Sequence, residues 1–574
     1  MPDHAGGTWQ QAQAGNQAVI IQVGGNAGNI TVGADRPALW LDPRDRSTTT
    51  PTERAAHLIP DYRFLHCIGR EDVLQRLQAW LDDPKPLSVR AIIGDGGRGK
   101  TRLAMELCHQ AGEEWHAGFV PDGALKRLYE QHDPATWRWL GPTLVVVDYA
   151  ARVTDLLRRW LLALEKMSQG TEAPKLRILL LERHGQTGGG WWKSLFHQGS
   201  WEDETLNRLL PDPEPEKLQP LTTEHRLALF IHAVGRYGGS GEALQANALL
   251  QQRLEHTDWA GDPLYLAMAA QVAVEQNAED ALSLSRAELA FRIAERERKH
   301  LLSHVPNNNR DQTRLLPHLA AMLTLCQGLD RTRLMAVIEH EKEVLGYSDA
   351  GGRGTLADLL SEALPSETEG EAAFIRPDMI GEAFILQELR QPDQAVLRAF
   401  HVAGIDVAAT IIHCVQDFAL EGRKEPLAWL DGLLAQTEIS TEDLWKIANL
   451  IPQSSVTLME HAVRIYADIE SRLRKDISSH GRADAIPFLA GTLNNLAVSL
   501  AAMGRREEAL QQAQEAVKIT RELAAARPEA FRPDLAMSLN NLANSLSELG
   551  RREEALQQAQ EAVKIYRELA AARP

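Results

Sequence analysis

Apolar residues between positions 61 and 270 follow two alternating patterns. Short runs of aliphatic and β-branched residues at Val89–Ile93, Leu144–Val147 and Ile178–Leu181 are separated by stretches in which apolar positions have helical spacing. Strands that alternate with helices in this way form a parallel sheet. We therefore expect an α/β core in this part of the chain.

The pattern after Leu221 is helical to the end, apart from a short β-prone piece at Ala373–Ile375. Within this part, the segment RREEALQQAQEAVKI at Arg505–Ile519 recurs 46 residues later at Arg551–Ile565. A period of this size is typical of helical solenoids. The pattern predicts a helical repeat array in the last part of the chain.

The first part of the chain has a different composition. Residues 5–34 carry no Asp, Glu, Lys or Arg, and Gly, Gln and Asn surround the β-branched run Val19–Val23. Glycine at this density disfavours helix, whereas low charge with β-branched and Gln/Asn residues favours stacked cross-β strands. A disordered tail and a β-forming segment both fit this pattern. The Pro- and Thr-containing stretch Arg36–Thr52 is expected to be a linker.

Charge and composition limit the classes of function. The 574 residues include 61 Lys and Arg against 78 Asp and Glu, a net charge of −17, which argues against a general nucleic-acid binder. The sequence has no apolar run long enough for a membrane span and no signal peptide. The four cysteines lie far apart without a C-x-x-C pair, so we expect reduced thiols and a cytoplasmic protein.

A phosphate-binding loop follows the first apolar run. Gly94–Thr101 fits G-x-x-x-x-G-K-[ST] between an expected strand and an expected helix. Glycines allow backbone N–H groups to converge on phosphate oxygens, and the helix N-terminus adds its positive dipole end. Lys100 is expected to reach the β- and γ-phosphates, and Thr101 to bind Mg²⁺. The residues expected to bind ATP or ADP here are Gly94, Gly96, Gly97, Gly99, Lys100, Thr101 and Arg102.

Two further polar residues follow the other apolar runs. Asp148 can hold the Mg²⁺ shell together with Thr101, or it can cap a following helix. Tyr149 stands where many ATPases carry a second acid, so we expect slow hydrolysis. Arg183 can contact a γ-phosphate, or it can form a surface salt bridge. Asp148 and Arg183 are the candidate catalytic residues.

These pieces, in this order, resemble the STAND class of signalling NTPases, which includes NB-ARC and NLR-type proteins. Cys67–Glu71 is similar to the segment "h-G-R-E" before the family's first helix, where Ile68 and Arg70 would lie near adenine. Leu218–Leu221 is similar to the start of the family's helical lid. Gly261–Leu264 resembles the motif "G-x-P-L", in which Pro263 would pack on adenine, although this proline could simply begin a helix.

Phe374–Glu382 resembles the end of the family's winged-helix domain. There an "M-H-D" tripeptide senses the bound diphosphate, and the matching residues here are Arg376, Pro377 and Asp378. The histidine is absent, so the resemblance leaves only Asp378 as a candidate nucleotide contact.

The repeats resemble tetratricopeptide repeats of a lengthened type, with Gly504 and Gly550 at the helix–helix turns. Such arrays bind proteins or peptides on a concave face. Pro574 matches Pro528 of the previous copy, which predicts that the array continues beyond it.

The N-terminal segment resembles the "V-Q-V-G-x-x-N" core of RHIM-type amyloid signalling motifs. The resemblance implies a signal passed by amyloid templating to an effector protein with a matching motif. The residues that carry it are Val19, Ile20, Ile21, Gln22, Val23, Gly24, Asn26 and Ile30.

Together these observations predict an α/β P-loop NTPase core followed by an all-α lid, a winged helix and a helical solenoid of tetratricopeptide repeats, after a disordered or amyloid-forming tail. The expected boundaries are 1–36 for the uncharged segment, 37–60 for a linker, 61–215 for the core, 216–300 for the lid and 301–400 for the winged helix. A helical connector with a degenerate repeat is expected at 401–480, and the repeats at 481–574.

The resemblance implies an NLR-like switch that binds ATP or ADP with Mg²⁺, forms a nucleotide-dependent homo-oligomer and acts in bacterial immunity or regulated cell death. Its repeats would sense a protein or peptide. One alternative is a STAND-type transcriptional regulator, for which the sequence offers no basic recognition helix. The other is a repeat scaffold whose nucleotide site is structural.

Overall fold

The computed structural model describes residues 10–14, 18–22, 29–30, 39–46, 56–121, 124–131, 139, 141–168, 173–185, 190–196, 202–245, 247–305, 309–364, 371–436, 438–452 and 455–571. The chain forms two compact units. The first comprises Met1–Ala150, Lys166–His184 and Pro215–Gly432, and the second comprises Ala151–Glu165, Gly185–Glu214 and Leu433–Pro574. Two segments of the expected core, 151–165 and 185–214, therefore group with the repeats, and the expected connector 401–480 divides between the units.

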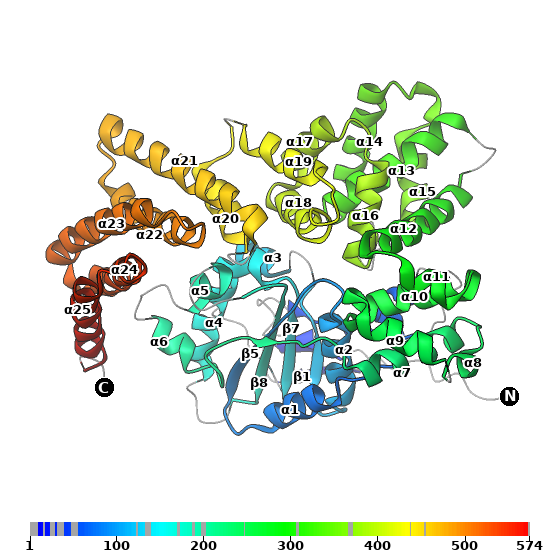
Figure 1. The fold of residues 1–574 in the computed structure, drawn as a ribbon, viewed down its shortest axis with the longest axis horizontal. Coiled ribbons are helices and arrows are strands. Elements are labelled where there is room, and N and C mark those ends of the chain that lie inside the picture. Colours follow the sequence, from blue (N-terminus) through cyan, green and yellow to red (C-terminus); the bar gives the residue numbers. More distant parts are fainter. Residues whose placement is uncertain are drawn as a thin grey trace. The chain divides into compact units, whose positions relative to one another are not determined.

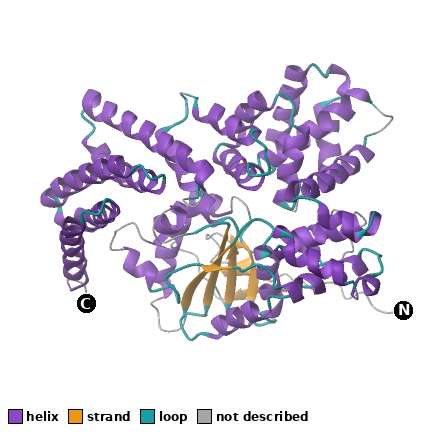
Figure 2. Ribbon diagram, viewed as in Figure 1, coloured by secondary structure: helices purple, strands orange, loops and turns teal. Residues whose placement is uncertain are grey.

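A five-stranded parallel sheet forms the centre of the first unit, as the alternating pattern predicts (Figure 1). Helices make up most of the remaining structure (Figure 2). The strand order is β6-β7-β8-β5-β9, which places the strand of the phosphate loop between β8 and the short β9. The strands are β5 (Leu87–Ile93), β6 (His116–Phe119), β7 (Thr143–Val147), β8 (Leu176–Glu182) and β9 (Glu216–Lys217).

Helices α1 (Glu71–Asp82) and α2 (Lys100–Gln110) pack on one face of this sheet. Leu77, Leu103 and Leu107 are fully buried there, against alternate residues of the strands such as Leu144 and Leu179. Because this packing fixes α2 against the sheet, it also fixes the phosphate loop that joins β5 to α2.

Part of the expected linker is docked on the sheet. The backbone N–H of Asp42 donates to the carbonyl of Phe119 at 2.8 Å, and the N–H of Phe119 donates back to Asp42 at 2.7 Å. Leu41 is fully buried. A Cβ at Gly118 would lie 2.8 Å from the carbonyl oxygen of Asp42, so glycine permits this approach. Asp42 therefore pairs with the edge strand β6 through a single bridge and docks its segment there.

The helical part of the first unit follows β9. Helices α13 and α16 pack against each other, and two short strands, β10 (Leu329–Asp330) and β11 (Glu371–Ala372), pair antiparallel beside α14 and α15. The helices are α7 (Thr223–Arg236), α8 (Gly241–Gln245), α9 (Ala248–His256), α10 (Pro263–Glu275), α11 (Ala278–Ser283), α12 (Arg286–Ser303), α13 (Arg310–Leu325), α14 (Arg331–Leu345), α15 (Arg353–Ala363), α16 (Asp378–Glu388), α17 (Pro392–Ala403) and α18 (Ile405–Phe418).

The repeat helices of the second unit each pack on the next along the chain. Buried polar residues recur at matching places, and Asn494 donates to Ser538 at 2.8 Å across neighbouring repeats. Gly504 and Gly550 have the same φ of 75° at the two turns. The helices are α20 (Thr441–Leu450), α21 (Val456–His480), α22 (Ile486–Ala502), α23 (Arg506–Ala526), α24 (Pro528–Glu548) and α25 (Arg552–Ala571).

One stretch among the described residues, Ala483–Ala502, is long and apolar enough to cross a membrane by length and composition alone, and 56% of it is buried in the fold. It contains α22, whose Leu493 and Leu496 belong to the packed interior of the array.

The N-terminal segment contains an antiparallel pair of strands, β1 (Gln10–Ala14) and β2 (Ala18–Gln22). Four of the candidate signalling residues, Val19 to Gln22, lie in β2, and Ile30 lies in β3 (Asn29–Ile30), which pairs with β4 (Leu39–Trp40). Val23, Gly24 and Asn26 lie outside the described residues.

The turn glycines of the array provide a stability test. Replacement of Gly504 by Ala puts a Cβ on a left-handed backbone, so we expect a loss of about 1 kcal/mol. Gly491 in α22 is the matched control, since its added Cβ would meet only a Trp445 side-chain carbon at an ordinary 3.9 Å. We expect Gly491→Ala to stabilise by about 0.5–1 kcal/mol. The check is the urea midpoint of full-length protein, and equal midpoints for the two variants would contradict the expectation.

Candidate functional site

The phosphate loop closes around its own lysine. Lys100 Nζ donates to the carbonyl oxygens of Gly94 at 2.5 Å and Asp95 at 3.1 Å. Gly97 and Gly99 have φ of 80° and 90°, which only glycine adopts without strain. The N–H groups of the first turn of α2 have no partners within the helix. A lysine and a helix N-terminus facing one glycine-rich loop fit a nucleotide phosphate.

Two oxygen ligands suitable for Mg²⁺ lie beside the loop. Thr101 Oγ1 donates to Asp148 Oδ2 at 3.0 Å, and Arg44 Nη1 lies 3.5 Å from the same oxygen. Burial raises the pKa of Asp148, and Arg44 and Thr101 oppose this rise. Hydroxyl and carboxylate oxygens are the donors that Mg²⁺ prefers, so Thr101 and Asp148 fit the ion.

Arg183 is buried at the end of β8 rather than lying on the surface. Its Nη1 is 2.5 Å from Asp417 Oδ2, and its Nη2 is 2.8 Å from Glu382 Oε1. Burial disfavours the charged form of Arg183, but the two carboxylates outweigh it and raise its pKa well above the usual value. Burial and then Asp417 raise the pKa of Glu382, against the effect of Arg183. Arg183 therefore ties the sheet to α16 and α18.

Helices α10 and α16 cover the phosphate loop at close range. A Cβ at Gly96 would lie 2.9 Å from Met379 Cε, and one at Gly97 would lie 3.3 Å from a ring carbon of Tyr265. The Tyr265 hydroxyl donates to Met379 Sδ at 2.9 Å. The loop glycines therefore serve a second purpose, because they permit two helices from distant parts of the sequence to touch the loop.

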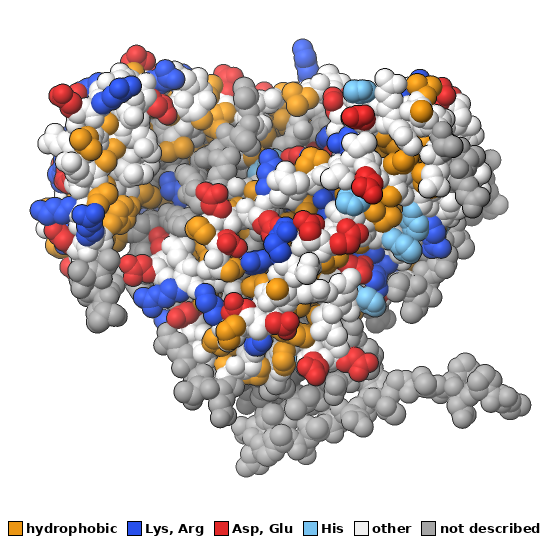
Figure 3. Space-filling model, turned by 60° about the horizontal axis from the view of Figure 1, so that its bottom comes forward, with side chains coloured by type: hydrophobic (Ala, Val, Ile, Leu, Met, Phe, Trp, Pro, Cys, Tyr) orange, Lys and Arg blue, Asp and Glu red, His pale blue; other side chains and the backbone are white. Residues whose placement is uncertain are grey.

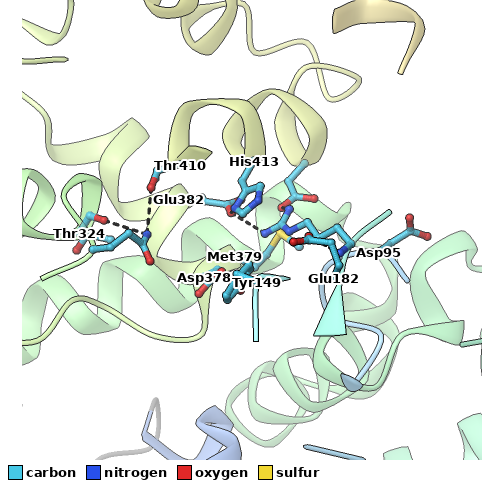
Figure 4. A network of polar contacts seen from close by, with 12 residues as sticks. Asp95, Tyr149, Glu182, Thr324, Asp378, Met379, Glu382, Thr410 and His413 are labelled. Atoms are coloured by element: carbon cyan, nitrogen blue, oxygen red, sulfur yellow. Dashed lines mark hydrogen bonds and ion pairs between the residues drawn. The ribbon is translucent and has the colours of Figure 1, made fainter. Parts of the chain in front are cut away.

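Tyr149 links the end of β7 to the tripeptide that matches "M-H-D". Its hydroxyl donates to Asp378 Oδ2, and its ring centroid lies 5.6 Å from that of His413. Figure 4 shows Glu382 and His413 close to Tyr149, Asp378 and Met379. The residue that replaces a second acid thus joins the sheet to α16.

Asp378, Glu382 and His413 also bring three possible metal-ligand atoms within 4.8 Å of one another. The guanidinium of Arg183 already lies 2.8 Å from Glu382. Its positive charge opposes a second cation there, so we assign this cluster to Arg183.

The residues expected near adenine line the other side of the loop. Pro263 begins α10, as one of its two expected roles requires, and its Cγ would lie 3.6 Å from a Cβ at Gly99 of the phosphate loop. Ile68 is half-buried. Buried Arg70 donates to the carbonyls of Gln219 at 2.8 Å and Arg98 at 3.1 Å, and so ties the segment before α1 to the loop.

Arg102 has a different position from the one expected of a phosphate ligand. Its Nη1 donates to Glu106 at 2.8 Å, and its Nη2 donates to the carbonyl of Leu65 at 3.3 Å. In this structure the guanidinium therefore stabilises α2 against the preceding segment instead of facing the loop.

Sequence patterns did not single out Arg44, Glu382, His413 or Asp417. Glu382 falls within the segment that resembles the winged-helix end, so its position carried a signal that could have been used. Asp417 and Arg44 lie in no motif, and only the folded chain brings them to Arg183 and Asp148.

Comparison with known proteins identifies the repeats. Residues 488–568 match the family model for the tetratricopeptide repeat, which covers most of α22 to α25. No curated protein matches the chain. The last part of the chain is therefore a tetratricopeptide-repeat array, and the match does not extend to the nucleotide site.

Several solved structures show weak likeness. A STAND protein with a tetratricopeptide repeat sensor from Pyrococcus horikoshii is 12% identical, with 88% of this chain and 77% of that chain covered and a TM-score of 0.28. A Walker-type ATPase of Pyrococcus abyssi is 14% identical, with 55% and 95% covered and a TM-score of 0.26. A chain of Drosophila ORC bound to DNA is 16% identical, with 58% and 94% covered and a TM-score of 0.23. At these TM-scores the likeness carries no conclusion about function.

The lysine of the loop gives a pH test. Burial, and next the charge of Arg183, lower the pKa of Lys100 to about 8. The ammonium form that attracts phosphate is therefore lost as the pH rises above 8. We expect the Kd for ATP to rise by up to roughly 20-fold between pH 7.5 and 9.5, measured with a fluorescent nucleotide at constant salt.

The control is Lys100→Arg, because a guanidinium stays charged over this range. If this variant binds nucleotide, its Kd should stay flat. An unchanged Kd for the unmodified protein at pH 9.5 would show that Lys100 does not titrate as its burial requires.

Proposed function

We propose that this chain is a STAND-type, NLR-like switch that binds ATP or ADP with Mg²⁺ and changes its assembly with the nucleotide. One observation carries the proposal. Arg183, at the end of the strand beside the phosphate-loop strand, is held by carboxylates of α16 and α18.

The physical basis is competition for one guanidinium. Arginine binds carboxylates and phosphates with the same forked geometry. While Glu382 and Asp417 hold Arg183, it is not available to a γ-phosphate. ATP offers a γ-phosphate and ADP does not, so only ATP competes with the two helices. α16, one of the two helices that hold Arg183, also covers the loop through Met379, so losing these ion pairs would loosen that cover.

Because the ion pairs of Arg183 with Glu382 and Asp417 are buried, the loss of either partner is costly. Removing one member of a buried pair leaves an uncompensated charge, which costs about 3–5 kcal/mol. The arrangement therefore favours two states, one with Arg183 on the carboxylates and one with Arg183 on phosphate. Tyr149 in place of a second acid supports slow hydrolysis, which suits a switch better than a turnover enzyme.

The helices that follow the lid support the finer family assignment. The order α13, β10, α14, α15, β11 and α16 provides three helices and a small antiparallel pair before the segment around Asp378. We propose that this is the winged-helix domain of the family, with Asp378 bound to Tyr149 instead of sensing nucleotide through a histidine.

The first test compares nucleotide binding and assembly. We expect Lys100→Ala to abolish ATP and ADP binding, and Asp417→Asn to raise the preference for ATP over ADP at least about tenfold. Size analysis with ADP and with a non-hydrolysable ATP analogue should show the larger species with the analogue. Glu388→Gln is the control, because Glu388 lies on α16, the other helix that holds Arg183, and pairs with Arg298 at 3.1 Å, away from Arg183.

Two results would contradict the switch. If Lys100→Ala bound nucleotide as tightly as the unmodified protein, the phosphate loop would not be the nucleotide-binding site. Binding without any change of assembly would favour the alternative in which the repeats act as a scaffold and the nucleotide is structural.

We propose that the repeats bind a protein or peptide ligand. A cleft of about 510 Å³ lies between α23, α24 and α25, lined by Val517, Arg521 and Leu542 among others. Charged side chains, among them Lys518 and Glu522, lie beside the apolar ones in this cleft. Figure 3 shows charged and hydrophobic side chains mixed on the surface of the molecule. Solenoid repeats bind their partners on extended faces of this kind.

We also propose that the N-terminal segment signals to an effector with a matching amyloid motif, in bacterial immunity or regulated cell death. The paired strands β1 and β2 support this proposal, because they hold Val19 to Gln22 in extended conformation. A cytoplasmic location is supported by the four cysteines, all free of disulfides.

A peptide test addresses the segment alone. We expect residues 1–40 to form thioflavin-positive fibres, and Gln22→Asp to prevent them, because a charge stacked in register repels itself along the fibre. Ala5→Asp carries the same charge outside the strands and should still form fibres. An unmodified peptide that stays soluble, or two variants that behave alike, would refute the signalling role.

A further inference from the structure

The segment 39–46 is held on the sheet by more than its backbone. Leu41 is fully buried and Asp42 is 8% exposed. The two hydrogen bonds between Asp42 and Phe119 are the edge pairing already described. This segment lies between the N-terminal strands and the NTPase core, so whatever holds it also holds the attachment of the N-terminal segment.

Arg44 reaches from this segment into the nucleotide site. Its backbone N–H donates to Asp42 Oδ1 at 2.8 Å, and its guanidinium lies 4.4 Å from the ring centroid of Phe119. Its Nη1 lies 3.5 Å from Asp148 Oδ2. The side chain of Arg44 is 15% exposed, and its Nε also lies 4.0 Å from Asp42 Oδ2 of its own segment. The largely buried guanidinium is therefore held by the Phe119 ring, by Asp42 and by the proposed magnesium-binding carboxylate of Asp148.

The same carboxylate oxygen accepts from Thr101. Thr101 Oγ1 lies 3.0 Å from Asp148 Oδ2, the atom that Arg44 contacts. Thr101 and Asp148 are the two residues proposed for Mg²⁺. Arg44 therefore balances the negative charge of Asp148 at Oδ2, the oxygen atom that would bind Mg²⁺.

We propose that Arg44 is a positioning residue that holds residues 39–46 on the sheet only while Asp148 has no metal ion to bind. This inference rests on the proposed function. Mg²⁺-nucleotide and docked Arg44 oppose each other, because two cations near one carboxylate repel strongly where water is largely excluded. Nucleotide without metal leaves Arg44 in place.

The consequence falls on the N-terminal segment. β6 is an edge strand of the sheet, so release of residues 39–46 removes its only neighbour on that side among the described residues. β4 pairs with β3, which carries Ile30 of the proposed signalling motif. Release would therefore pass the state of the magnesium site directly to the N-terminal strands, by a route separate from Arg183.

The experiment uses the full chain and two readouts. First, we expect Arg44→Ala to bind Mg²⁺-ADP about 5–10-fold more tightly than the unmodified protein, with equal ADP affinity in EDTA. Arg44→Lys, which keeps the charge, should lie near the unmodified protein. Arg46→Ala is the matched control, because Arg46 is two residues away and is tied to Asp61 through its backbone N–H.

Second, hydrogen exchange is measured at the amides of Asp42 and Phe119 in the unmodified protein. We expect Mg²⁺-ADP to speed their exchange at least about fivefold and ADP in EDTA to leave it unchanged. This readout needs no variant, so a variant that fails to fold leaves the test intact.

Two outcomes would overturn the inference. If the exchange rates of both amides were the same with and without Mg²⁺-ADP, the metal would not release the segment. An Arg44→Ala affinity equal to that of the unmodified protein would show that Arg44 does not compete with the ion. Absence of ADP binding even in EDTA would instead contradict the proposed function, so the two failures are distinguishable.

Discussion

The ion pairs between Arg183 and the carboxylates of Glu382 and Asp417 connect the sheet of the first unit to its helical part. A charged guanidinium that is 95% shielded is costly to bury unless carboxylates pair with it. The two carboxylates carry more negative charge than the single guanidinium can balance. Burial, and next the charge of Asp417, therefore raise the pKa of Glu382. The local charge balance therefore depends on α16 and α18 remaining against the end of β8. The cover over the phosphate loop and the position of Tyr149 depend on that arrangement.

The glycines of the phosphate loop show how one residue type satisfies two constraints. Positive φ at Gly97 and Gly99 shapes the loop, and the missing Cβ at Gly96 leaves space for Met379. The first constraint is local and is visible in the motif. The second depends on a helix that begins at Asp378, far along the chain. The sequence motif therefore predicts the conformation of the loop but not the contact that the loop makes with α16.

The sequence predicted what adjacent residues determine. The strands β5, β7 and β8, the phosphate loop, Asp148 and the repeats each depend on a short segment, and the structure has them where the pattern indicates. It did not predict contacts between polar residues distant in the chain, such as Arg183 with Asp417 or Arg44 with Asp148. Several carboxylates could satisfy either arginine, and only packing selects one. The stretch around Arg44 looked like a linker because its backbone pairing is with a distant strand.

The near-identity of the repeats has a consequence beyond folding. The ion pair between Arg505 and Glu508 recurs between Arg551 and Glu554, and the glycine turns recur with the same φ. Each repeat therefore packs on the next repeat in the same way as the previous repeat packs on it. A gene that gained or lost a whole unit by recombination between identical stretches would need no new interface. The length of the repeat array can vary during evolution while the chemistry of each junction stays constant.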